Sequence, residues 1–107
     1  MTYGLTDKDL EKINEIFLLY PTIERVIIYG SRVKGNYKPG SDIDLALVGN
    51  GIDLNLLNNV SRKLDDLLLP YSFDLSIFSH IKNSELIDHI NHAGKQLYKS
   101  EAGVLHD

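Results

Sequence analysis

Apolar residues recur along this chain with two different periods, and these periods predict where helices and strands lie. A first helix is predicted by apolar residues at helical spacing, namely Leu10, Ile13, Phe17 and Tyr20. Thr6 begins this helix as a capping residue and Pro21 ends it. The β-branched run at 25–29, which Gly30 terminates, predicts a buried strand, and residues 31–35 are predicted to form a short helical turn.

The rest of the chain continues this alternation of helices and strands. Strands are predicted at residues 42–48 and 72–78. Asp53 caps the helix between them, whose predicted apolar stripe consists of Leu57, Val60, Leu64, Leu67 and Leu68. A last helix then precedes a short extended segment at residues 95–98.

This order of elements predicts the fold class. Helix, strand, short helix, strand, helix, strand and helix in succession favour an α/β (α+β) fold, in which a small mixed β-sheet is flanked by helices. The link between the first two strands allows them to be antiparallel or to lie adjacent around the short helix. With 107 residues, we expect a single domain over residues 1–107.

Composition and charge narrow the function classes. The chain has no cysteine, which excludes disulfides, thiol nucleophiles and cysteine-ligated metal sites. Its formal net charge of −4 and its scattered basic residues argue against binding to long nucleic acid. The local trio of Arg32, Lys34 and Lys38 suits a small anion such as a nucleoside triphosphate. No apolar run approaches the roughly 18 to 20 residues that span a bilayer, so we expect a cytoplasmic protein with no membrane contact.

Gly30 and Ser31 lie at a predicted strand-to-helix junction. Glycine permits a tight turn and a close approach of a ligand to the backbone, and N–H groups at the start of a helix favour an anion such as phosphate. Gly30 and Gly35 do not complete a P-loop, because Asn36-Tyr37 follow where Lys-Ser or Lys-Thr is required. A serine cap after a turn glycine is also common in structures without function, so the pair alone leaves both interpretations open.

Three aspartates are the candidate catalytic residues. Asp42 and Asp44 alternate in the second predicted strand, so their side chains share one face, with Cα atoms about 6.5 Å apart. At roughly 6 Å two carboxylates repel by about 0.7 kcal/mol in water and about 3 kcal/mol at an effective dielectric near 20. Arg32, Lys34 or a magnesium ion could offset this repulsion. Asp74, in the apolar third strand, would complete a carboxylate cluster for two metal ions if the two strands are neighbours.

The histidines offer a weaker alternative metal site. The chain contains His80, His89, His92 and His106. Only His89 and His92 have the spacing that shares a helix face, and no third ligand lies near them in the sequence. The sequence therefore favours the aspartates over the histidines as ligands.

The motif residues resemble the signature of a known superfamily. Gly30-Ser31-Arg32-Val33-Lys34-Gly35, then Ser41-Asp42-Ile43-Asp44-Leu45, then Asp74 resemble the DNA polymerase β-like nucleotidyltransferases. In length and in this motif the chain is similar to a minimal nucleotidyltransferase (MNT) domain. Members of that group are commonly antitoxins that are paired with a HEPN-domain toxin. The resemblance therefore implies a nucleotidyltransferase fold and a hetero-oligomer with such a partner.

The resemblance also implies roles for individual residues. It implies nucleotide binding by Gly30, Ser31, Arg32 and Ser41. Among these, Ser31 would bind the β- and γ-phosphates of ATP, and Arg32 would contact phosphate. Asp42 and Asp44 would ligate two Mg²⁺ ions, while Asp74 would help to hold the metal and assist deprotonation of the acceptor. AMP would be transferred to a hydroxyl, expected to be a tyrosine, of the HEPN toxin.

Two alternatives compete with this hypothesis. The chain could be a non-catalytic antitoxin that neutralises its partner by stoichiometric binding, or a small-molecule nucleotidyltransferase of the antibiotic-modifying type. The complete set of three aspartates favours catalysis over binding alone. The absence of residues for an acceptor-holding domain disfavours a small-molecule acceptor.

Overall fold

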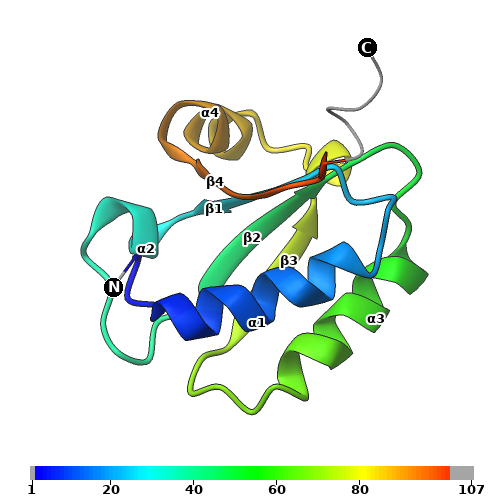
Figure 1. The fold of residues 1–107 in the computed structure, drawn as a ribbon. Helices are drawn as coiled ribbons and strands as arrows, with labels where there is room; N and C mark the ends of the chain where they lie inside the picture. The colour runs from blue at the N-terminus through cyan, green and yellow to red at the C-terminus, as the bar shows by residue number, and fades with distance from the viewer. Residues whose placement is uncertain (1, 102–107) are drawn as a thin grey trace.

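The structure, a computed structural model, describes residues 2–101; His106 and the ends of the expected domain lie outside the described residues. Within them the chain forms α1 (Asp7–Leu18), β1 (Arg25–Tyr29), α2 (Ser31–Lys34), β2 (Ile43–Val48), α3 (Leu54–Asp65), β3 (Phe73–Ile77), the 3₁₀ helix η1 (Phe78–His80), α4 (Ser84–Ala93) and β4 (Lys95–Lys99) (Figure 1). The predicted order of helices and strands is confirmed. None of the helices in this part of the chain is long and apolar enough to cross a membrane.

The four strands form one mixed sheet in the order β3-β2-β1-β4, which confirms the predicted fold class. β1 pairs antiparallel with β2 and with β4, so the possibility left open by the sequence is resolved as an antiparallel pair. β2 and β3 are parallel, because the chain crosses back over the sheet through α3 between them. This crossover places the first residues of β2 and β3 at the same end of the sheet.

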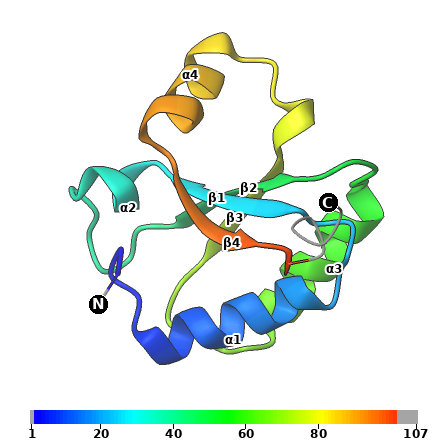
Figure 2. The same ribbon diagram turned by 45° about the horizontal axis from the view of Figure 1, so that its top comes forward.

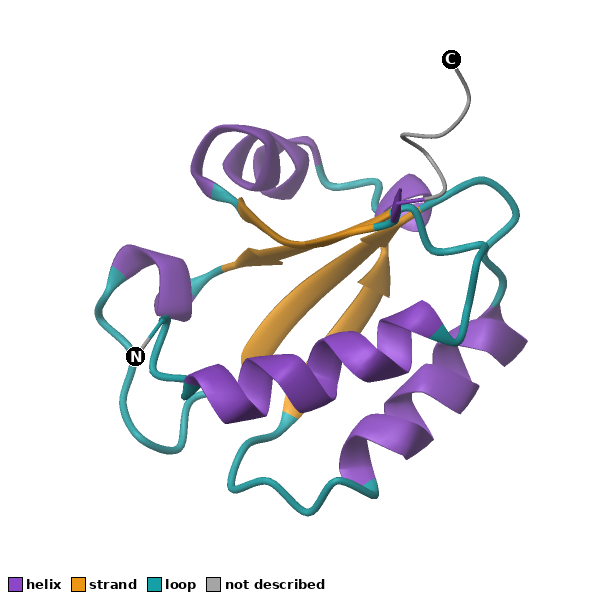
Figure 3. Cartoon of the chain, viewed as in Figure 1, coloured by secondary structure: helices purple, strands orange, loops and turns teal. Residues whose placement is uncertain are grey.

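Helices cover the two faces of the sheet unequally (Figures 1, 2 and 3). α1 and α3 lie along one face, where they bury the larger core, including Phe17, Val60 and Leu64. α4 lies against the other face, where Ile90 packs with Ile27 in a smaller cluster. Because β1 is covered on both faces, nearly every residue of it is buried, which explains its continuous apolar run.

Side-chain caps fix the starts of three helices. Thr6 accepts a hydrogen bond from the Asp9 amide at 3.0 Å, and Asp53 caps α3 as predicted. Asn83 is the cap of α4. The prediction that Leu68 belongs to the apolar stripe of α3 is wrong, because α3 ends at Asp65 and the side chain of Leu68 is 88% exposed. The chain leaves the helix there with a φ of 55° at Leu68, which turns this side chain away from the core.

Candidate active site

The sheet register brings two of the predicted carboxylates together. Asp44 of β2 lies directly beside Asp74 of β3 in the parallel pair, so the expectation that these strands are neighbours is confirmed. Asp44 also lies opposite Tyr29, the last residue of β1. Gly30 follows Tyr29, so the Gly30–Ser31 turn lies at the end of the sheet at which β2 and β3 begin.

The carboxylate of Asp44 is repelled by the neighbouring carboxylates of Asp74 and Asp42. Partial burial raises the pKa of the Asp44 carboxyl above its ordinary value, and the negative charges of Asp74 and Asp42 raise this pKa further. A hydrogen bond that protonated Asp44 can donate to Asp74 acts in the same direction. Asp42 and Asp74 are exposed and Asp44 is half-buried. A cation bound here would relieve the repulsion.

The donor set fits a magnesium ion by its chemistry. Carboxylate oxygens are the ligands that Mg²⁺ prefers, and Asp44 and Asp74 lie within hydrogen-bonding reach of each other. Within residues 2–101, however, no three side chains of the ligating types converge closely enough to hold a metal ion. Asp42 lies one residue before β2, outside the strand pairing. Asp44 and Asp74 therefore form an adjacent pair of carboxylates, and Asp42 is an exposed third carboxylate near Asp44.

Gly30 is tightly enclosed between two side chains. Its φ of +80° and ψ of −149° belong to a region that only glycine adopts readily. A Cβ atom built on Gly30 would collide with Oδ2 of Asp44, so the backbone lies directly against this carboxylate. On its other side, the Gly30 N–H donates a hydrogen bond of 3.0 Å to Nε2 of His89. The sequence predicted that Gly30 allows a ligand to approach the backbone closely. In the structure the carboxylate of Asp44 already makes such a close approach, and this alone requires a glycine at position 30.

Arg32 has an arrangement that the sequence did not indicate. It is 3% exposed, and its guanidinium donates to the backbone carbonyls of Tyr3, at 3.2 Å, and Ser41, at 2.8 Å. The rings of Tyr37 and Tyr71 enclose it, with centroids 4.7 and 5.3 Å from its Cζ atom. Arg32 therefore joins the N-terminal segment to the loop before β2. Its contact with phosphate stays a prediction.

Ser41 closes a tight loop before the first aspartate. Its hydroxyl accepts a hydrogen bond from the Lys38 amide at 2.8 Å, and its own amide donates to the Lys38 carbonyl at 2.9 Å. Arg32 donates to the carbonyl of the same residue, so Ser41 is held both by Lys38 and by Arg32. The arrangement positions Asp42, which is the next residue, while nucleotide binding by Ser41 stays a prediction.

His89 is a residue of this region whose role sequence reasoning missed. Its ring packs edge-on against Tyr29, with ring centroids 6.2 Å apart and an interplanar angle of 74°. Burial raises the pKa of the Tyr29 hydroxyl, a hydrogen bond with Ser76 lowers it, and the charges of Asp44 and Asp74 raise it. The signal available in the sequence was that His89 is three residues after Leu86, on the apolar side of the last helix.

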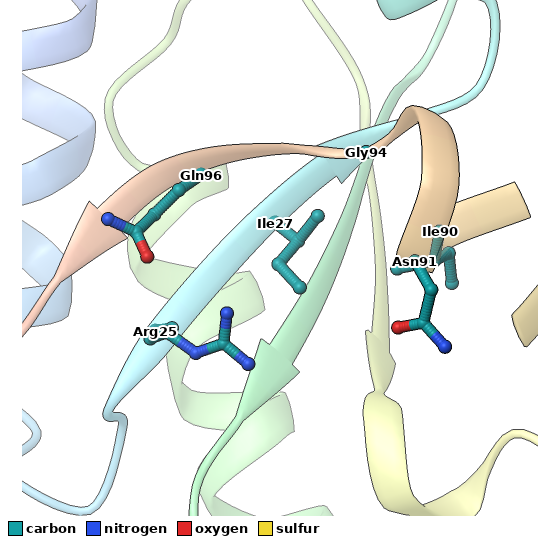
Figure 4. Close-up of a pocket in the computed structure, with 6 residues that line it drawn as sticks. All are labelled: Arg25, Ile27, Ile90, Asn91, Gly94 and Gln96. Carbon is teal, nitrogen blue, oxygen red and sulfur yellow. The ribbon is translucent and has the colours of Figure 1, made fainter.

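Two cavities adjoin these elements. One, of about 230 Å³, lies between α4 and strands β1 and β4; Figure 4 shows its lining residues, Arg25, Ile27, Ile90, Asn91, Gly94 and Gln96. The other, of about 350 Å³ and mostly apolar, is lined by Gly4, Arg32, Tyr37, Pro39, Pro70 and Tyr71. The first cavity contains none of the predicted site residues, and the second contains only Arg32 of them.

Comparisons with solved structures give the same fold. A crystal structure of a toxin–antitoxin with AMP-PNP is 22% identical, with a TM-score of 0.68, and the match covers 92% of this chain and 77% of that chain. A rebuilt structure of a tri-AMPylated Shewanella oneidensis HEPN toxin in complex with MNT antitoxin is 20% identical, with a TM-score of 0.65, over 94% of this chain and 77% of that one. A toxin–antitoxin MntA-HepT structure is 20% identical, with a TM-score of 0.65, over 92% and 76%.

The family itself is shown by the sequence. No curated protein matches this chain. The family model described as Polymerase beta, Nucleotidyltransferase matches residues 11–102, which include the Gly30–Ser31 turn and all three aspartates. Together with the shared sheet and helix arrangement, this match shows that the chain belongs to the Polymerase beta nucleotidyltransferase family.

Proposed function

We propose that this chain is a Mg²⁺-dependent nucleotidyltransferase that moves AMP from ATP to a tyrosine hydroxyl of a HEPN-type toxin and thereby acts as its antitoxin in the cytoplasm. The observation that carries the proposal is the pair of carboxylates, Asp44 and Asp74, in register beside the Gly30 turn. Two of the similar structures support the nucleotide and the partner, because one contains AMP-PNP and another an AMPylated HEPN toxin with its MNT antitoxin.

The proposed reaction is an in-line displacement at the α-phosphorus of ATP. The acceptor oxygen forms a bond to this phosphorus, the bond from the phosphorus to the β-phosphate oxygen breaks, and pyrophosphate leaves. The proton of the hydroxyl passes to the exposed carboxylate of Asp74. Ser31 and the backbone around Gly30 hold the β- and γ-phosphates. Magnesium, when bound, neutralises phosphate charge and lowers the pKa of the attacking hydroxyl.

The three aspartates would divide the work by their position. Asp42 and Asp44 would hold the two ions, and Asp74, on the neighbouring strand, would help to hold the metal near the acceptor and take up its proton. Positioning and charge neutralisation supply most of the rate enhancement in such a reaction. The large acceptor would supply its own binding surface, so the two proteins would form a hetero-oligomer.

A labelling experiment tests the proposal. The protein is incubated with α-³²P-labelled ATP, Mg²⁺ and a HEPN-domain protein encoded beside it, and compared with an Asp42→Asn/Asp44→Asn double variant. A matched control is Glu11→Gln/Glu15→Gln, which removes two exposed carboxylates from α1. We expect label on the partner with the wild type and the control, and none with the aspartate variant or with EDTA.

The same experiment separates the competing functions. If the double aspartate variant silences the toxin fully without labelling it, the protein acts by binding alone and the transferase proposal is wrong. If label appears on an added aminoglycoside and never on the partner, the acceptor is a small molecule. Mass spectrometry of the labelled partner then identifies the modified residue, which we expect to be a tyrosine.

A further inference from the structure

His89 connects helix α4 to the Gly30–Ser31 turn. The two residues are 59 positions apart, yet Nε2 of His89 accepts the hydrogen bond of the Gly30 N–H at 3.0 Å. Because Nε2 is the acceptor, the imidazole is neutral and carries its proton on Nδ1. The ring also packs edge-on against Tyr29, so it is held by two independent contacts. This is a directed interaction from one layer of the fold to another.

The turn that His89 holds lies between two parts of the candidate site. Gly30 lies against Oδ2 of Asp44, and the next residue, Ser31, begins α2. Glycine has more backbone freedom than any other residue, so the local backbone of Gly30 does not by itself fix the orientation of the peptide plane between residues 29 and 30. A rotation of that plane would move the turn relative to Asp44. The hydrogen bond to His89 opposes this rotation.

We propose that His89 is a positioning residue for nucleotidyl transfer: it fixes the Gly30–Ser31 turn against Asp44 in the conformation that binds the triphosphate. The inference rests on the proposed function. His89 touches neither nucleotide nor acceptor in this role. Since the turn would hold the triphosphate in both the ground state and the transition state, removal of His89 is expected to change KM for ATP more than kcat.

Kinetics of AMP transfer give the first test. In His89→Leu the Gly30 N–H loses its acceptor, and we expect KM for ATP to rise about tenfold, equivalent to about 1.4 kcal/mol. In His89→Gln the amide oxygen reaches the place of Nε2, and we expect KM to return to within about threefold of the wild type. His92→Leu is the matched control, because His92 is exposed on the same helix and its Nδ1 contacts the Asp88 carbonyl.

A measurement without activity separates this inference from the proposed function. Labelling with [¹⁵N]glycine gives amide signals from the eight glycines of the chain, among which Gly30 should move in His89→Leu and stay in place in His92→Leu. An unmoved Gly30 signal, an unchanged KM in His89→Leu, or a His89→Gln variant as impaired as His89→Leu would each overturn the inference. Failure of the wild type to transfer AMP would instead contradict the proposed function, while the glycine spectrum still shows whether His89 holds the turn.

Discussion

Replacement of Asp44 by asparagine isolates the cost of a carboxylate at the centre of the site. Burial, the charges of Asp74 and Asp42, and the hydrogen bond to Asp74 all raise the pKa of Asp44, so its ionised form is disfavoured in the folded protein. Asparagine keeps the shape and the hydrogen-bonding capacity of the side chain but removes its charge. We expect Asp44→Asn to abolish AMP transfer and, at the same time, to raise the stability of the metal-free protein.

The size of this gain follows from the strand pairing. Neighbouring strands are about 4.8 Å apart, and two unit charges at this distance repel by about 0.9 kcal/mol in water and about 3.5 kcal/mol at an effective dielectric of 20. Asp74 is exposed and Asp44 is half-buried, so solvent screening places the interaction near the lower value. A gain of about 1 kcal/mol corresponds to a rise in melting temperature of about 4 °C or more in a domain of this size.

The pH dependence has a definite sign. Because the pKa of Asp44 is higher in the folded than in the unfolded protein, the folded state binds this proton more tightly. The wild type therefore loses stability as pH rises from below the ordinary value of 3.8 through the raised value, and the Asp44→Asn variant lacks this loss. The difference between the two proteins should be largest near neutral pH and vanish in acid, where Asp44 is protonated.

Thermal unfolding by circular dichroism, with EDTA or with Mg²⁺, checks these expectations. Glu11→Gln is the control for loss of a single exposed negative charge. In EDTA the Asp44→Asn variant should melt above the wild type, whereas Mg²⁺ should raise the melting temperature of the wild type and leave that of the variant almost unchanged. A variant that melts below the wild type in EDTA would refute the repulsion argument. An equal effect of Mg²⁺ on both would refute metal binding by Asp44.

Three further substitutions test separate parts of the structure. Gly30→Ala forces a Cβ against Asp44 at a φ of +80°, with about 1–2 kcal/mol of backbone strain, so AMP transfer measured by label on the partner should fall at least about tenfold. Arg32→Leu removes two charged hydrogen bonds and two ring contacts from a buried position, and urea unfolding should show a loss of about 3 kcal/mol or more. Leu68→Lys changes a side chain that is 88% exposed, so the unfolding free energy from the same urea titration should stay within about 0.5 kcal/mol.

The helices and strands could be predicted because their signals are local. Alternation and helical spacing depend only on neighbours in the sequence, and caps such as Thr6 and Asp53 act within three residues. Leu68 shows where a local pattern fails: an apolar run can continue after the backbone has left the helix. The sequence marks the end of the helix only at Pro70, whereas in the structure α3 ends at Asp65 and Leu68 has a left-handed conformation.

The candidate site could be predicted only in part. The motif singled out the three aspartates, and the structure places Asp44 beside Asp74, whereas Asp42 lies one residue before β2 and not within the strand as predicted. The contacts of Arg32 and His89 could not be predicted because their partners are distant in the chain: Arg32 binds the Tyr3 carbonyl 29 residues before it, and His89 binds the Gly30 amide 59 residues before it. A basic side chain next to a phosphate-binding turn suggests an anion contact, and only the tertiary packing shows that backbone carbonyls and aromatic rings already surround it.

The alternation of side chains along β2 explains how the charged residue Asp44 can lie near the start of an otherwise apolar strand. Ile43 and Leu45 are fully buried on the face that α1 and α3 cover, whereas Asp44 points to the opposite face, which α4 covers with a smaller cluster. Ala46, the next residue on that face, is buried in this cluster. The face therefore changes from apolar at Ala46 to charged at Asp44, which lies at the end of the sheet close to Gly30. The same alternation that stabilises the core on one side of β2 therefore places the Asp44 carboxylate on the other side. A shift of one residue in this register would bury Asp44 in the main core, so the pairing that stabilises the fold also keeps the charged site in place.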